Sequence, residues 1–151
     1  MKKIFLIFIC ISVLFTIQLY GKNPVSEKKV IYTKNAPKPI GPYSQAIQAG
    51  NTLYLSGQIA IDSTTGQIIA GDIKQEAEQV LKNIKAVLNE AGYEMSDIVK
   101  TTIYLTDLNN FADVNKVYAS FFKEKFPARE TVQVAALPKK ARVEISVIAV
   151  K

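Results

Sequence analysis

The sequence contains no histidine and only one cysteine, Cys10. The lack of histidine excludes Ser-His-Asp and Cys-His catalysis and the usual zinc ligand sets. Because Cys10 lies in an apolar N-terminal run, the rest of the chain offers no disulfide, cysteine nucleophile or cysteine-based metal site. Any chemistry must therefore come from carboxylates, arginine, tyrosine, hydroxyl groups and the backbone.

The first 21 residues have the pattern of a secretory signal peptide. Two lysines follow Met1, and residues 4–17 form an apolar run of 14 residues that is too short for a comfortable membrane span. Gly21 is a suitable small residue before a cleavage point, whereas Leu19 is larger than the position two residues earlier usually allows. We predict export to the periplasm or the exterior, with no membrane contact after cleavage; an uncleaved membrane anchor is the alternative.

The remainder of the chain has the length of one domain. Residues 22–29 are polar and contain a proline, which is typical of a flexible tether, and residues 30–151 form the predicted domain. Without the leader, 17 basic residues stand against 13 acidic ones. No basic stripe interleaved with aromatic residues is present, so a solvated surface explains the charge and no nucleic-acid partner is expected.

Apolar residues at helical spacing predict two helices whose buried stripes belong to the core. The first begins at Asp72, with Gln75 at the capping-box position, and Gly92 ends it. The second is capped within residues 107–110 and extends to about Lys123.

Alternating and β-branched segments predict strands on either side of these helices. They cover residues 30–33, 44–49, 52–58 and 98–106. The element order predicts an α+β fold of two layers, with both helices on one face of a mixed sheet. The other face is then either wet or paired with another subunit, and half-apolar strands favour pairing.

The C-terminal part predicts a hairpin that carries the candidate site. Its two strands and their turn cover residues 130–136, 141–150 and 137–140. In this register Glu144 pairs with Gln133 and shares a face with Arg129, on the order of 13 Å away along the strands. A carboxylate on a half-apolar face near a guanidinium is typical of a carboxylate-binding site, whereas two solvated rim charges are the alternative.

Two further positions are candidates for contact with a ligand. Gly57 interrupts a strand, which indicates a bulge or a close approach, so its backbone N–H and the Ser56 hydroxyl are candidates for polarising a substrate. A plain bulge is the alternative. Tyr43 follows an irregular Gly41-Pro42 stretch, and its ring either seals this loop or covers a ligand.

Six short segments, in this order, resemble the RidA family of reactive enamine/imine deaminases between about residues 30 and 151. They are Ile40-Gly41-Pro42-Tyr43-Ser44-Gln45, Leu55-Ser56-Gly57-Gln58-Ile59, Asp97-Ile98-Val99-Lys100-Thr101-Thr102, Phe111-Ala112-Asp113-Val114-Asn115, Phe126-Pro127-Ala128-Arg129 and Arg142-Val143-Glu144-Ile145. Each segment is short, but six in one order are a specific signal.

The resemblance implies a chorismate-mutase-like fold and a homotrimer with three clefts between subunits. It also implies hydrolysis of a 2-imino acid, the tautomer of a 2-enamino acid, to a 2-keto acid and ammonia without a metal or cofactor. Arg129 would hold the substrate carboxylate, and Glu144 would move protons between water and the leaving ammonia. Tyr43 would cover the site from a neighbouring subunit.

The remaining implied site residues are Ser56, Gly57, Thr131 and Asn115, and the chain departs from the family at two positions. Thr131 stands where several members carry cysteine, which leaves its backbone available for binding. Ser146 replaces a second glutamate found in many members. A trimer that binds small carboxylates without turnover, and an RNA-cleaving or chaperone-like role, are the alternative functions.

Overall fold

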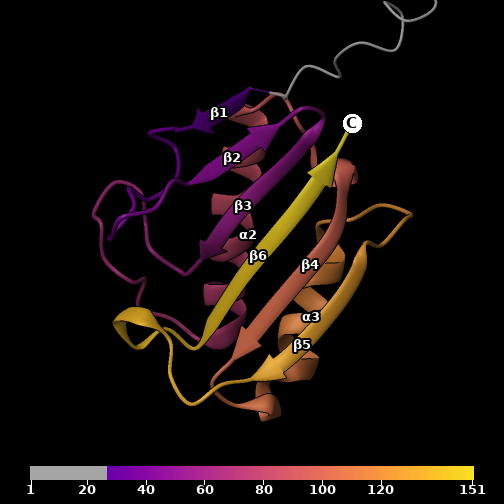
Figure 1. The fold of residues 1–151 in the computed structure, drawn as a ribbon. Coiled ribbons are helices and arrows are strands. Elements are labelled where there is room, and N and C mark those ends of the chain that lie inside the picture. The colour runs from indigo at the N-terminus through magenta and orange to yellow at the C-terminus, as the bar shows by residue number, and fades with distance from the viewer. Residues whose placement is uncertain (1–26) are drawn as a thin grey trace, which may run out of the picture.

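The computed structural model describes residues 27–151, so the predicted signal peptide and most of the predicted tether lie outside the described residues. A six-stranded mixed sheet forms one layer, in the order β1-β2-β3-β6-β4-β5 (Figure 1). Only β4 and β5 are parallel; all other neighbours are antiparallel. The strands are β1 (Lys28–Ile31), β2 (Ala46–Ala49), β3 (Thr52–Gln58), β4 (Ile98–Leu105), β5 (Ala128–Gln133) and β6 (Val143–Val150).

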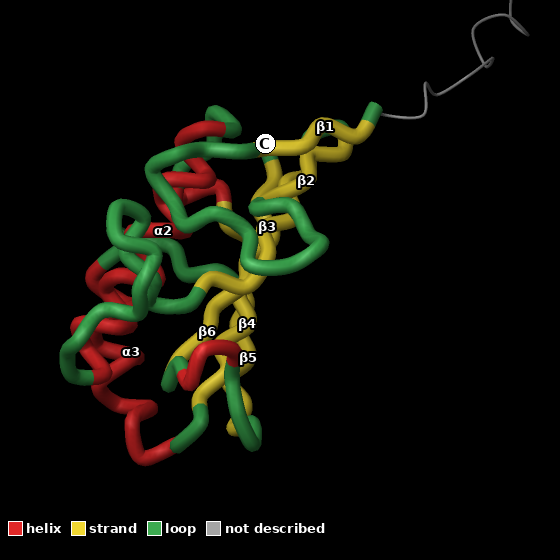
Figure 2. Tube along the Cα trace, turned by 90° about the vertical axis from the view of Figure 1, so that its left-hand side faces the viewer, coloured by secondary structure: helices red, strands yellow, loops and turns green. Residues whose placement is uncertain are grey.

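The two helices, α2 (Ile73–Glu90) and α3 (Phe111–Ser120), lie on the same face of the sheet (Figure 2). This arrangement confirms the predicted α+β fold of two layers. At the start of α2, Asp72 and Gln75 form the predicted capping box, each side chain accepting the other residue's N–H at 2.9 Å. None of the helices in residues 27–151 is long and apolar enough to cross a membrane.

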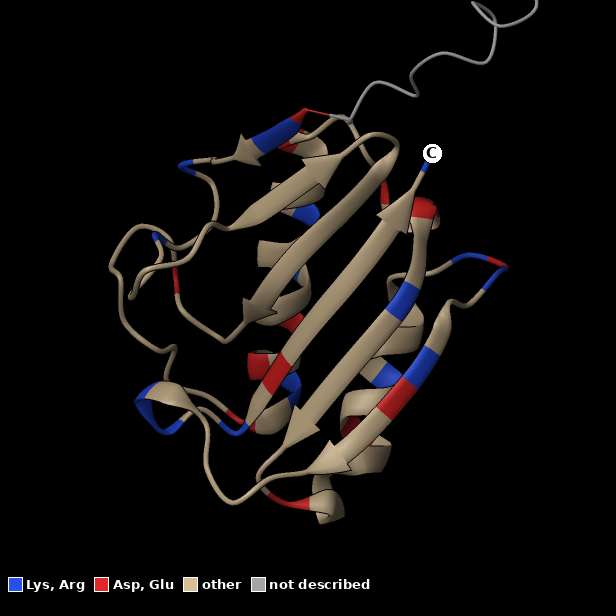
Figure 3. Cartoon of the chain, viewed as in Figure 1, with Lys and Arg blue, Asp and Glu red and all other residues tan. Residues whose placement is uncertain are grey.

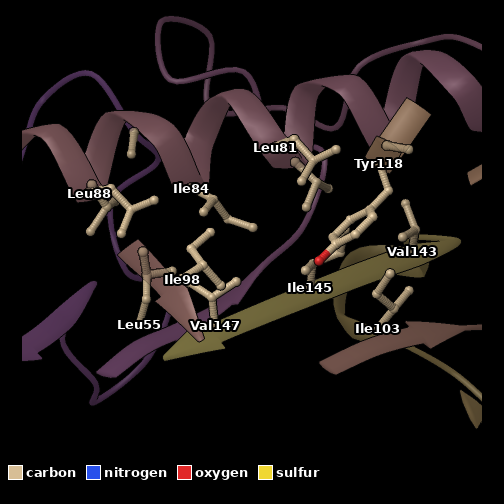
Figure 4. Packing of buried hydrophobic residues seen from close by; sticks show 14 of the residues in the cluster. Leu55, Leu81, Ile84, Leu88, Ile98, Ile103, Tyr118, Val143, Ile145 and Val147 are labelled. Atoms are coloured by element: carbon tan, nitrogen blue, oxygen red, sulfur yellow. The ribbon is translucent and has the colours of Figure 1, made fainter. Parts of the chain in front are cut away.

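The core lies between the helices and the sheet (Figure 4). Along β6, buried aliphatic residues alternate with partly exposed ones, as a strand with one covered face requires. Leu81, Ile84 and Leu88 of α2 lie over Ile145 and its neighbours. Burying each such side chain contributes about 1.5–3 kcal/mol to folding, so this packing fixes where the strands lie under the helices.

β5 and β6 do not form the hairpin that the sequence analysis expects. β4 lies between them and pairs with both, so Glu144 faces Tyr104 of β4 and not Gln133. The connection over residues 134–142 runs past the end of β4, where Leu105 accepts a hydrogen bond from the Val134 N–H. Successive strands are neighbours in only about two thirds of cases, and here the apolar β4 takes the more buried central place.

Val99 is a second departure from the sequence pattern, because simple alternation along residues 98–106 would place it on the same face as the buried Thr101. Val99 is 47% exposed, while Ile98 is 5% exposed. An irregularity in the β4–β6 register between Ile98 and Lys100 causes the difference, because a bulge reverses the facing of the residues beyond it.

Gln45, which is 2% exposed, fixes the irregular loop that precedes β2. Its side-chain oxygen accepts from the Thr33 N–H at 2.7 Å. Its side-chain nitrogen donates to the backbone oxygens of Thr33, Ala36 and Pro37 at 3.0, 3.3 and 2.8 Å. One buried amide therefore supplies the hydrogen bonds that the loop backbone cannot make within a strand.

We expect Gln45→Leu to lower the free energy of unfolding by about 2–4 kcal/mol, because it leaves several loop groups buried without partners. Urea unfolding at one fixed protein concentration measures the change. Gln67→Leu, at an exposed turn position, is the matched control and should change stability by less than about 0.5 kcal/mol. Equal effects in the two variants would contradict the assignment.

Candidate functional site

Glu144 lies on the face of the sheet opposite the helices, against a bulge in β3. The bulge falls between Leu55 and Gln58, as the glycine in this strand predicts. A Cβ atom on Gly57 would lie 2.0 Å from Glu144 Oε1. Only glycine at this position therefore lets the carboxylate lie directly against the strand backbone.

The surroundings of Glu144 disfavour its charged form. The side chain is half-buried, and burial raises the pKa of the Glu144 carboxyl above its ordinary value. Within residues 27–151 the carboxylate has neither an ion pair with a basic side chain nor a hydrogen bond from a protein donor. A carboxylate with a raised pKa is a better proton acceptor than an ordinary solvated one.

Ser56 and Tyr43 both belong to the region where β3 meets the loop that precedes β2. The Ser56 hydroxyl donates to the Ser44 oxygen at 2.7 Å, and the Ser56 N–H donates to the Gln45 oxygen at 3.0 Å. The Ser56 donor is thus engaged in joining the bulge to the loop. The Tyr43 oxygen accepts from the Ile40 N–H at 3.1 Å, while 45% of the residue stays exposed. Tyr43 therefore both seals its loop and presents an open ring.

Arg129 lies on the other face of the sheet, because it pairs with the buried Thr101 of β4. Its Nη1 donates to the Asn115 Oδ1 at 2.7 Å. The guanidinium carbon lies 5.0 Å from the centre of the Tyr118 ring and 5.8 Å from that of Phe111. Burial raises the pKa of the Tyr118 hydroxyl, so this ring supports the guanidinium without a charge of its own.

No acidic side chain of the described part of the chain forms an ion pair with Arg129. Asn115 and the two rings fix the orientation of the guanidinium, and several of its five N–H donors remain for a ligand. A fixed guanidinium with free donors is a receptor for a carboxylate. Asn115, predicted from the family resemblance, is thus a direct partner of Arg129.

The sequence analysis missed Phe111 and Tyr118 as supports of Arg129, since it assigned both to the buried stripe of the second helix. Tyr118 is buried, but Phe111 is 42% exposed. Phe111 is four residues before Asn115 and Tyr118 is three residues after it, so all three lie on one side of α3. This spacing was the available signal.

Thr131 lies two residues after Arg129 on the same face, paired with the buried Ile103. β5 is an edge strand, and the N–H of Val134 just beyond it points to β4. Backbone N–H groups alternate in direction along an extended strand. The N–H groups of Arg129 and Thr131 therefore point to the free edge, where no strand of residues 27–151 pairs with them.

The two groups of residues do not meet within one chain. Arg129 and Glu144 lie on opposite faces of the sheet, on either side of β4, and their backbone positions are about 14 Å apart by strand spacing. The prediction that they share a face is wrong, because it depends on a β5–β6 hairpin that does not form. Each chain thus carries two incomplete sites: Glu144 with Gly57 and Ser56, and Arg129 with Asn115 and Thr131. Tyr43 lies next to Ser44 in the loop that is hydrogen-bonded to Ser56.

No cluster of three or more acidic or cysteine side chains within residues 27–151 has a geometry that could hold a metal ion. Among the described residues, Glu144 can transfer protons, and Arg129 and the edge of β5 can bind an anion.

A profile of the family described as "Endoribonuclease L-PSP" matches residues 33–151. The chain belongs to this family. The match covers all the residues of both incomplete sites, and it confirms the resemblance to the RidA family that the sequence shows.

Relatives in this family are similar over nearly their whole length. A RutC family protein of Pyrococcus horikoshii is 58% identical over 124 residues, which are 82% of this chain and 98% of that protein. The human 2-iminobutanoate/2-iminopropanoate deaminase is 48% identical over 124 residues, 82% of this chain and 90% of that protein. The crystal structure of E. coli TdcF with bound serine is 45% identical, with a TM-score of 0.79 and coverage of 82% and 98%.

We expect Glu144→Gln to raise the free energy of unfolding at pH 7, by less than about 1 kcal/mol because the carboxyl is half-exposed. A raised pKa means that the folded state holds the proton more tightly than the unfolded state. The native glutamate is therefore relatively stable at low pH and loses this stability as the pH rises above the ordinary pKa of a glutamate.

Urea unfolding of both proteins between pH 4 and pH 8 measures this difference, which should widen as the pH rises. Glu90→Gln, at an exposed position, controls for the loss of one negative charge. A difference that shrinks with rising pH would show that the folded state favours the ionised carboxylate.

Proposed function

We propose that the protein is a deaminase that hydrolyses short-lived 2-imino or 2-enamino acids to 2-keto acids and ammonia. One observation carries the proposal: within residues 27–151, each chain holds an unpaired carboxylate with a raised pKa and, on the other face of the sheet, an oriented guanidinium without an acid partner. A small imino acid needs both groups, one for its carboxylate and one for its reacting C=N bond. Human and mouse relatives are named for this reaction, which supports it.

The two incomplete sites meet if the working form is a homotrimer with its sites between subunits. The face of the sheet without helices carries few charges on its central strands (Figure 3). A row of paired residues, Val30, Ile47, Tyr54 and Ile148, crosses this face, and Val30 and Tyr54 are 61% and 51% exposed. An apolar row of this kind favours burial against another copy of the chain.

A head-to-tail contact that brings the β5 edge of one copy to the Glu144 face of the next closes into a ring. Three copies then form three equivalent sites, each with Arg129, Asn115 and Thr131 from one subunit and Glu144, Gly57 and Tyr43 from its neighbour. This division of the site explains why neither half is complete in one chain.

In such a site the substrate carboxylate pairs with Arg129 and with the N–H groups at the edge of β5. The imine carbon then points to the neighbouring Glu144, which takes a proton from a water molecule as the oxygen of that water bonds to the carbon. Glu144 returns the proton to the nitrogen of the tetrahedral intermediate. The C–N bond then breaks while the hydroxyl oxygen forms the C=O bond and gives its proton to the Glu144 carboxylate, and ammonia and the 2-keto acid leave. Because a protonated imine carbon is already electrophilic, these steps need neither a covalent nucleophile nor a histidine.

A binding protein for small carboxylates is the second candidate, and the structure of TdcF with bound serine favours it. It requires Arg129 but not proton transfer by Glu144. The printed family description favours a third candidate, RNA cleavage. Salt-dependent RNA binding would have to be found for this, since phosphate contacts dominate nucleic-acid affinity.

We expect Arg129→Ala to lose substrate binding, and Glu144→Gln to keep binding but reduce ammonia release at least about 100-fold, the usual contribution of general acid-base catalysis. The assay is ammonia release from 2-aminoacrylate generated enzymatically in the reaction mixture. Lys85→Gln, at an exposed position on α2, controls for the loss of one positive charge. Full activity in Glu144→Gln would exclude Glu144 as the group that transfers the proton. Ammonia release by the native protein no faster than the spontaneous rate would leave only the binding function.

Mixing the two inactive variants tests whether the halves come from different chains. Co-expressed Arg129→Ala and Glu144→Gln chains should form mixed assemblies in which about a quarter of the sites combine an intact Arg129 with an intact Glu144. Activity should therefore return to about a quarter of the native value. If both residues served the same site from one chain, the mixture would stay as inactive as each variant alone.

We also propose that the chain is exported, on the basis of its leader pattern alone. N-terminal sequencing of the protein from its native host should then begin near Lys22. An intact Met1 in a membrane fraction would support the uncleaved anchor, and an intact Met1 in the soluble cytoplasm would exclude export.

A further inference from the structure

The Thr131 hydroxyl is the only buried side-chain oxygen or nitrogen in residues 27–151 without a hydrogen-bond partner. Its neighbours in the same row of β5 differ from it. Arg129 donates to Asn115 at 2.7 Å, and the Gln133 Oε1 accepts from the Leu108 N–H at 3.0 Å. The unpaired hydroxyl thus lies between two side chains that each make a hydrogen bond.

Such a group costs stability, because folding removes the hydroxyl from water and returns no hydrogen bond. Valine has the same shape and a higher strand propensity, and it would occupy this position without the cost. The apolar Ile103, opposite Thr131 on β4, is the kind of neighbour that a valine suits. Packing alone therefore gives no reason for a threonine here.

The position of Thr131 indicates what the hydroxyl serves. Thr131 follows Arg129 by two residues on the same face, and its backbone N–H points to the same free edge of β5. A rotation of about 120° around χ1 exchanges the hydroxyl with the methyl group. The methyl group then fills the apolar place that the oxygen occupies now, and the hydroxyl turns to another side of the strand.

We propose that Thr131 is a specificity-determining residue whose hydroxyl turns, when a ligand binds, to donate a hydrogen bond to the carboxylate held by Arg129. The proposal rests on the proposed function, because it uses the same anion-binding half of the site. Binding of a carboxylate removes the cost of the unpaired hydroxyl and adds a charge-assisted hydrogen bond. The ligand class selected is a small 2-oxo or 2-imino acid with a free carboxylate, as opposed to its amide or ester.

The test compares Thr131→Val, which removes the hydroxyl and keeps the shape, with Thr131→Ser, which keeps the hydroxyl. Two quantities are measured on the full-length, assembled protein: the urea midpoint of unfolding, and the affinity for 2-oxobutanoate and for its amide by titration calorimetry. Arg129→Ala tests the carboxylate site itself. Thr101→Val is the matched control for stability, because the Thr101 hydroxyl is also buried but lies 3.0 Å from the Tyr118 hydroxyl.

We expect Thr131→Val to raise the urea midpoint and to bind 2-oxobutanoate about tenfold more weakly, as the loss of a hydrogen bond to a charged group predicts. Thr101→Val should lower the midpoint. Thr131→Ser should bind within about threefold of the native protein. The preference of the native protein for the acid over its amide should fall in Thr131→Val, a change that a purely structural role would not produce.

Three results overturn the inference while leaving the proposed function intact. They are unchanged affinity in Thr131→Val, a lowered midpoint in Thr131→Val, which would show that the hydroxyl has a partner in the assembly, and an equal loss of affinity in Thr131→Ser. By contrast, native-like affinity in Arg129→Ala, or no ammonia release by the native protein, counts against the proposed function itself.

Discussion

The placement of β4 between β5 and β6 is the constraint on which the site depends. It puts Arg129 and Glu144 on different strands, on different faces and on opposite sides of the same central strand. A chain folded in this way cannot bring the two side chains together by any small movement. In the proposed trimer, another copy of the chain supplies the missing half of the site.

An ion pair with one buried partner fixes the end of the connection between β5 and β6. Glu76 of α2 is 5% exposed, and its carboxylate accepts from the Arg142 Nε at 2.9 Å and from the Arg142 Nη2 at 2.8 Å. Arg142 also donates from Nη2 to the Gly71 oxygen at 2.6 Å. Since Arg142 immediately precedes β6, these bonds set the point at which the strand carrying Glu144 begins. The pair need not add net stability to fulfil this geometric role, because burying the Glu76 charge has its own cost.

The local features of the chain were predictable from sequence, and the long-range pairing was not. The capping box at Asp72, the turn at Gly50 and the bulge at Gly57 each depend on residues close in the chain, and all three are present. The order of the strands depends on which strand buries most apolar surface, a competition that no short segment reveals. The prediction that Arg129 and Glu144 share a face was therefore wrong, because the face of Arg129 follows from strand order.

Residues of the helix layer show the same limit at a smaller scale. The apolar spacing of α3 identified Tyr118 and Phe111 without distinguishing the buried ring from the exposed one. The contact that gives both rings a role is with the Arg129 guanidinium, which lies over each of them. Arg129 comes from a strand that follows the helix in sequence. Cation–aromatic contacts between distant segments leave no periodic signal.

The free edge of β5 carries a hazard as well as a use. Unpaired backbone groups that can bind a carboxylate can equally template an extra strand from a foreign peptide, the first step of amyloid-like growth. The Lys100–Glu130 ion pair, at 2.7 Å on the outer two strands, puts charge where an incoming strand would lie. A strand edge that is left open to bind a ligand is also open to association with other strands. Charged side chains near such an edge are a common protection of natural sheets against this association.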